Sequence, residues 1–340
     1  AAADNASVQI AATADVETGS GGVTVIADDM DLDGTITASS QTVLLKSKTA
    51  GDTIDLGDAN EDTAGDLELS TAELANVTAD TLQVGAAGAG AVTVSADVTP
   101  SNVTNLHVLS GSTVTGTAGG VVVSGLAVTA GGAVNFTDTT TNVTNLAVDT
   151  STGDVTFTEA DGFSVTTVDT AVVGVDTDSG AVALTATAGS LTVVNTANAD
   201  DVAGTTTVAL TAGGDDNTLT ISTSADVEST GGAHTYVADK VDLSGTITAT
   251  GQVVTIAPEV VADLDDAIDL GGADAADTLG LTDAELDSVT AGTLRIGAAT
   301  ATGGIVVSAD VGPANASILR LQGDGGAVTS TAGGIAVADL

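Results

Sequence analysis

Short alternations of apolar and polar residues recur along the whole chain. Each places one residue between two apolar ones, which is the period-2 pattern of a strand with one buried face. Between them lie Gly, Asp, Asn, Ser and Thr, the residues that turns require. The alternations that predict strands are Val23–Val25, Leu82–Val84, Val92–Val94, Leu106–Val108, Val134–Phe136, Leu146–Val148, Val155–Phe157, Phe163–Val165 and Leu219–Ile221.

A strand about every ten residues is compatible with a β-sandwich, a propeller or a solenoid. Strands this short suit the narrow coil of a parallel β-helix. Sandwiches tend to use aromatic anchors, whereas this chain has no Trp, one Tyr and three Phe. Its interior must be thin enough for Ala, Val, Leu and Ile to fill. We therefore predict an all-β parallel β-helix, a β-solenoid, with coils of about 20 residues stacked at the strand spacing of about 4.8 Å.

A unit of about 212 residues occurs more than once. The stretch Glu68–Ala87 matches Gly280–Ala299 at twelve of twenty positions, and Val25–Ser39 returns as Tyr236–Thr250. Copy one spans roughly residues 14–224, and a partial copy two spans roughly residues 225–340. We expect one continuous solenoid over residues 1–340, which reads as a segment of a longer tandem array.

Both copies carry the same local helix signal. Ser70 with Glu73, and Thr282 with Glu285, fit the S/T-x-x-E capping box. We expect a single helical turn or an ordered loop there, with an ordinary turn as the alternative.

The second copy of this region resembles a known family. Residues Ile268–Val311 contain "IDLG", "LGLTDAELDSVTAGTLRIG" and "GGIVVSADV". These resemble repeats of the large filamentous-haemagglutinin-like exoproteins of bacteria, and residues Ile54–Val98 match more loosely. The resemblance implies an exported adhesin or matrix protein that folds as a right-handed parallel β-helix.

Composition narrows the classes of function. The chain has 5 Lys and Arg against 46 Asp and Glu, for a net charge of −41. Nucleic acids and anionic membrane surfaces require clustered basic residues, so neither is an expected partner. The absence of Cys excludes disulfides and Cys-rich zinc sites. No apolar run approaches the roughly 18 residues of a membrane helix, so we expect no membrane insertion.

Two acidic stretches are candidates for calcium. Asp29, Asp31 and Asp33 match the start of a D-x-D-x-D-G loop, although Ser40 occupies the position of its last acidic ligand. The alternative is a solvated strand edge, since copy two keeps only Asp242 of these acids. The stretch containing Asp215 and Asp216, and the stretch Gly271–Leu279, faintly resemble the repeats of calcium β-rolls. Calcium is thus possible, and no cofactor is required.

Catalytic chemistry has little support in the sequence. Carboxylates are abundant, but a polysaccharide-cleaving site usually adds cationic or aromatic groups that hold the sugar. His107 and His234 have no counterpart in the other copy, and we predict that both lie at the surface. We expect no enzyme activity. The basic residues are Lys46, Lys48, Lys240, Arg295 and Arg320.

Six N-x-S/T sequons are candidate glycosylation sites, with an asparagine turn ladder as the alternative. They lie at Asn5, Asn76, Asn102, Asn135, Asn142 and Asn315.

These observations favour a structural segment of an extracellular bacterial filament, such as a fibre, sheath or biofilm matrix, that assembles with itself end to end. One alternative is the stalk or binding region of a secreted surface adhesin, in contact with a cell surface or a polysaccharide. A second is a calcium-dependent surface-layer or β-roll protein.

Overall fold

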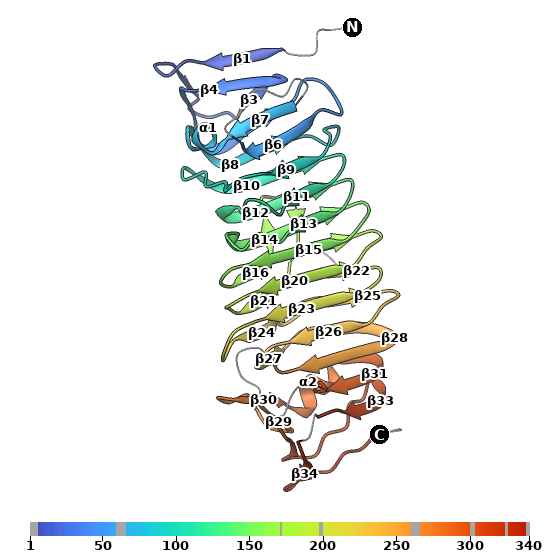
Figure 1. The fold of residues 1–340 in the computed structure, drawn as a ribbon. Helices are drawn as coiled ribbons and strands as arrows, with labels where there is room; N and C mark the ends of the chain where they lie inside the picture. The colour runs from blue at the N-terminus through green and yellow to red at the C-terminus, as the bar shows by residue number, and fades with distance from the viewer. Residues whose placement is uncertain are drawn as a thin grey trace. The chain divides into compact units, whose positions relative to one another are not determined.

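The structure is a computed structural model that describes residues 6–58, 66–170, 172–196, 200–259, 266–299, 303–323 and 326–337. The chain forms two compact units, and each is described by itself. Unit 1 comprises Ala1–Glu159 and Thr167–Val173, and unit 2 comprises Ala160–Thr166 and Gly174–Leu340. Figure 1 shows that short strands follow one another as successive rungs within each unit.

Unit 1 consists almost entirely of strands, with one short helix. Its elements are β1 (Ser7–Ile10), β2 (Asp15–Glu17), β3 (Val23–Ile26), β4 (Asp29–Leu32), β5 (Thr35–Lys46), β6 (Thr53–Gly57), β7 (Asp66–Ser70), α1 (Thr71–Ala75), β8 (Val77–Gly85), β9 (Val92–Val94), β10 (Val103–Ser110), β11 (Val114–Gly116), β12 (Val122–Ala130), β13 (Val134–Phe136), β14 (Asn142–Thr150), β15 (Val155–Glu159), β17 (Thr167–Val168) and β18 (Val172–Val173).

Unit 2 has the same character. Its elements are β16 (Phe163–Val165), β19 (Val175–Thr177), β20 (Val182–Ala186), β21 (Leu191–Val193), β22 (Val202–Gly204), β23 (Val208–Ala212), β24 (Thr218–Ile221), β25 (Asp226–Ser229), β26 (His234–Val237), β27 (Lys240–Leu243), β28 (Thr246–Ala257), β29 (Ala267–Leu270), β30 (Thr278–Leu281), α2 (Asp283–Asp287), β31 (Val289–Ile296), β32 (Ile305–Val307), β33 (Ala316–Leu321) and β34 (Val328–Ser330).

Like residues stack on like residues inside unit 1. Strand β12 pairs in parallel with both β10 and β14, so Leu106, Leu126 and Leu146 form one column. All three leucines are fully buried. Each step along this column is 20 residues, which matches the coil length expected from the sequence. A thin core of small aliphatic side chains is the result.

Unit 2 uses the same parallel pairing but longer coils. Val182 pairs with Val208 and Val208 with His234, so each step is 26 residues. The step from Leu191 to Leu219 is 28 residues. The expectation of a uniform coil of about 20 residues is therefore wrong here. The extra residues lie in turns, which lengthen without disturbing the stacked strands.

Both capping boxes are present as helices of five residues. In α1 the Ser70 side chain accepts from the backbone N–H of Glu73, and the Glu73 carboxylate accepts from the N–H of Ser70. In α2 Thr282 and Glu285 exchange the same two hydrogen bonds. A helical turn in each copy is confirmed, because the sequence supplies both halves of the cap.

The parallel β-solenoid is confirmed within each unit, and all nine predicted alternations lie within strands. The strand ladders described inside each unit are parallel, apart from the antiparallel pair β17–β18. That hairpin packs Val168 and Val172 onto Ala127 and Ala147 of unit 1. A single continuous solenoid over residues 1–340 and its right hand stay predictions.

Candidate functional site

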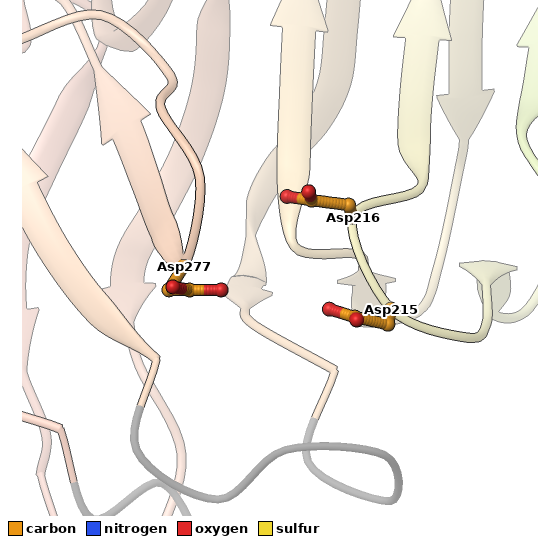
Figure 2. A group of neighbouring side chains, drawn as sticks. All are labelled: Asp215, Asp216 and Asp277. Carbon is orange, nitrogen blue, oxygen red and sulfur yellow. The ribbon is translucent and has the colours of Figure 1, made fainter.

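Three carboxylates from two separate turns meet in unit 2. Asp215 and Asp216 follow β23, and Asp277 directly precedes β30. Each contributes an oxygen, and these oxygens all lie within 4.8 Å of one another. All three residues are exposed, and Figure 2 shows their carboxylates pointing toward a common space. Among the described residues this is the one group with the geometry to hold a metal ion.

The backbone around this cluster is held in unusual conformations. Asp216 has φ 62° and Asp277 has φ 54°, the left-handed region that Asp tolerates better than most residues. The N–H of Asp216 donates to Asp239 Oδ2 at 2.8 Å. The Asp277 carbonyl accepts from the N–H of Ala267 at 3.1 Å. Both turns are thus tied to the solenoid, which places their side chains.

The cluster is only partly neutralised. Lys240 Nζ lies 2.8 Å from Asp216 Oδ1. Three carboxylates and one ammonium leave two negative charges on a solvent-facing surface. Calcium prefers several carboxylate oxygens at 2.3–2.6 Å, with water filling the remaining positions. Asp215, Asp216 and Asp277 are the residues that would hold it.

The sequence analysis named two of these three acids. Asp277 lies in the second β-roll-like stretch, but nothing in the sequence indicated that the two stretches meet. Calcium binding at Asp215 and Asp216 stays a prediction.

Calcium should stabilise unit 2 through this cluster. A free concentration tenfold above the dissociation constant adds about 1.4 kcal/mol, which raises the melting temperature by a few degrees. The measurement is a thermal melt with added calcium and then with excess chelator. Asp277→Asn should remove the response, whereas Asp29→Asn should keep it. An identical calcium shift in wild type and Asp277→Asn would exclude this cluster.

The other predicted calcium loop is part of a strand. Asp29 and Asp31 alternate along β4 with Met30 and Leu32, which are fully buried. The Asp31 carboxylate accepts from the Gln9 side chain on the neighbouring rung. Asp33 follows the strand and is exposed. The structure does not bring these acids together as a group of ligands in the described chain. Calcium at Asp29, Asp31 and Asp33 stays a prediction.

Many acidic side chains instead join one coil to the next. Asp28 Oδ1 accepts from the N–H groups of Lys48 at 2.9 Å and Thr49 at 2.7 Å. Burial pulls the pKa of Asp28 upward, but the hydrogen bonds from Thr49, Ala6 and Lys48 outweigh it and lower the pKa. Asp therefore contributes to cohesion as well as to surface charge.

The same device recurs at equivalent positions of the two copies. Asp97 accepts from the N–H of Gly120 at 3.1 Å, and Asp310 from that of Gly334 at 2.8 Å. Hydrogen bonds from Thr140 and Gly120 lower the pKa of Asp97. These contacts occupy acids that look like free surface charges in the sequence.

One acid in unit 2 has a strongly perturbed pKa. Burial raises the pKa of Asp274 to about 6, against the effect of hydrogen bonds from Gly280 and Val241. Its Oδ1 accepts from Gly280 at 2.8 Å and its Oδ2 from Val241 at 3.1 Å. Both oxygens therefore hold backbone N–H groups, the role that Asp28 and Asp97 play in unit 1.

Three sequon asparagines hold coils together through the nitrogen that a glycan would use. Asn76 Nδ2 donates to Leu32 O at 2.8 Å. Asn102 Nδ2 donates to Ala75 O at 2.9 Å, and Asn315 Nδ2 to Asp287 O at 2.6 Å. Glycosylation there would have to displace these bonds.

The other sequon positions are less engaged. Asn135 and Asn142 lie on strands β13 and β14 and are half-buried. Asn5 lies outside the described residues. Glycosylation at all six positions stays a prediction.

The prediction that both histidines lie at the surface is wrong. His107 is 3% exposed: its Nδ1 lies 3.1 Å from Asp169 Oδ2 and its Nε2 lies 3.1 Å from Thr129 Oγ1. The hairpin β17–β18 brings Asp169 to it, and a local sequence reading gives no sign of that return. Burial lowers the pKa of His107, although Asp169 acts in the opposite direction.

His234 is fully buried on β26. A signal for this was present, because His234 and Tyr236 occupy the inward positions of an alternating strand. The lack of a counterpart in copy one obscured it.

Comparison with models of known protein families, with curated protein sequences and with solved structures finds no match. None of the helices in the described ranges is long and apolar enough to cross a bilayer.

Proposed function

We propose that this chain is a structural segment of an extracellular bacterial filament, related to the filamentous-haemagglutinin-like exoproteins that its sequence resembles. The observation that carries this is the parallel, in-register stacking of coils such as Leu106, Leu126 and Leu146. Each rung presents the hydrogen-bonding edge that the next rung needs. The net charge of −41 and the absence of Cys support a soluble, exported surface.

Self-association end to end is part of the proposal. Within the described residues β2 pairs with β5 only, and its Val16 is 38% exposed. The equivalent residue in copy two, Val227, pairs with both Val202 and Ile247 and is fully buried. A further rung at β2, from a second copy or from a longer chain, would bury Val16 in the same way.

Cryo-electron microscopy of the purified chain tests this proposal. We expect thin rods with an axial layer line near about 4.8 Å. Val16→Asp should shorten or abolish them because it places a charge at the end rung. Val122→Asp is the matched control, since Val122 is 41% exposed on β12, where both flanking rungs are present. Separate particles at all concentrations would contradict self-assembly.

A second candidate function is a calcium-dependent surface-layer protein. The cluster of Asp215, Asp216 and Asp277 favours it. Loss of rods on chelation, with recovery after calcium is restored, would distinguish it from a filament that stacks by strands alone. The stalk of a secreted adhesin remains the alternative without a specific contact in this segment to support it.

A further inference from the structure

A chain of polar side chains lies inside the apolar core of unit 2. It runs from Ser229 at the end of β25 to His234 and Tyr236 on β26. His234 and Tyr236 are fully buried, and Ser229 is 4% exposed. His234 Nε2 lies 2.7 Å from Ser229 Oγ, and His234 Nδ1 lies 2.7 Å from Tyr236 Oη. We call these three residues the relay.

The hydrogen bonds of the relay fix the direction of each donor. Ser229 Oγ donates to the Gly232 carbonyl at 3.0 Å, so it must accept from His234 Nε2–H. Nδ1 then carries no proton and accepts from the Tyr236 hydroxyl. His234 is thus the neutral Nε2–H tautomer, and every polar atom of the three side chains has a partner of the right kind.

The surroundings offer nothing that would stabilise a charged imidazole. The neighbouring rungs place Val208 and Val254 beside His234. They place Leu210 and Ile256 beside Tyr236. Within the described strands that pack against β26, no carboxylate or cation faces the ring. Burial alone lowers the pKa of His234 to about 4 and raises the pKa of Tyr236.

Copy one shows that the fold does not need this chemistry. Thr18, Val23 and Val25 occupy the three equivalent positions. The parallel pairing is the same: Val23 and Val25 on β3 pair with β5, as His234 and Tyr236 on β26 pair with β28. A buried polar network in place of aliphatic residues is costly unless it is fully satisfied, so its presence in one copy calls for a function.

We propose that the relay is an acid-sensitive lock in the core of unit 2, closed while His234 is neutral and released when the imidazole takes up a proton. A proton on Nδ1 turns that atom into a donor facing the Tyr236 hydroxyl. The hydroxyl can then accept, but its own hydrogen loses its partner. The positive charge also sits among valines with no counter-ion.

The sign of the pH effect follows from the direction of the pKa change. A base whose folded pKa lies near 4 instead of 6.5 gives its full stabilisation above about pH 6.5. That stabilisation is lost as the pH falls from about 6.5 to about 4. Opening of β25–β26 should become about 300-fold more favourable over this range, the equilibrium equivalent of a pKa difference of about 2.5.

Hydrogen exchange on the full chain tests the lock. Protection of β25–β26, corrected for the intrinsic pH dependence of exchange, should fall between pH 7 and pH 4 in the wild type. The double variant His234→Val with Tyr236→Val restores the residues of copy one and should flatten the response. His107→Gln should leave it unchanged. A wild-type profile that is flat, or that matches the double variant, would overturn the lock.

A second measurement keeps the inference testable if the double variant does not fold. The chain has two histidines, so ¹⁵N-histidine labelling yields two imidazole spectra. We expect one ring in the Nε2–H form that stays neutral down to about pH 5. An Nδ1–H tautomer, or a pKa near 6.5 at both rings, would contradict the proposal. Neither experiment depends on filament formation, so the lock and the proposed function can fail separately.

Discussion

Gly85→Ala should lower the free energy of unfolding by about 3 kcal/mol or more, the sum of backbone strain and a displaced rung. Gly85 ends β8 with φ 93°, a conformation that L side chains rarely adopt. A Cβ at this position would lie 2.1 Å from the carbonyl oxygen of Leu109, which belongs to the next rung. That oxygen cannot move away without disturbing the parallel ladder between β8 and β10.

Chemical denaturation followed by circular dichroism measures the loss, and hydrogen exchange places it at β8 and β10. The matched control is Gly51→Ala. Gly51 has φ 89°, but a Cβ there would meet nothing within 4 Å. It carries the backbone strain without the clash, so we expect a loss of only about 1 kcal/mol. Equal losses for the two variants would show that the close approach of the rungs is not what requires Gly85.

The internal repeat provides an independent test of the same argument. Gly297 in copy two has φ 91°, and a Cβ there would lie 2.1 Å from the carbonyl oxygen of Gln322. Sequence alone shows that a glycine recurs at this position. Only the structure shows why, because the contact is with a residue about 25 positions further along the chain.

Local features of the fold were predictable from local chemistry. The alternation at Leu106–Val108 predicts a strand because inward and outward side chains must alternate on a pleated rung. The pairs Ser70 with Glu73 and Thr282 with Glu285 predict helix starts because each cap lies within four residues. These signals need no knowledge of which rungs are neighbours.

Contacts between rungs were not predictable in the same way. Asp277 joins Asp215 and Asp216 only because the coil lengths of unit 2 bring two distant turns to one place. His107 becomes buried because the hairpin β17–β18 places Asp169 on it. A change of two residues in a turn would alter such neighbours while leaving the strand pattern intact. Acidic residues were misleading for this reason, since their partners are backbone N–H groups of other coils.

Glu73→Ala should be among the most damaging single substitutions in unit 1. Glu73 is 5% exposed, and its Oε1 accepts from the N–H of Leu32 on β4 at 2.9 Å. Its Oε2 accepts from the N–H and from the hydroxyl of Ser70, both at 2.8 Å. Alanine would leave these buried donors without an acceptor, at a cost of about 1–3 kcal/mol for each one that stays unsatisfied. We expect a total loss of about 3–5 kcal/mol.

The equivalent glutamate of copy two should rank below it. Glu285 makes the same cap, but its Oε1 lies 3.3 Å from the N–H of Leu243, so that bond is weaker. Glu73→Gln keeps one acceptor oxygen and should fall between wild type and Glu73→Ala. Glu17→Ala, at an exposed position of β2, is the surface control. Urea denaturation of the four variants measures the order. If Glu73→Ala were no more damaging than Glu17→Ala, the carboxylate would not be joining α1 to β4, and the cap would be a local feature of the helix alone.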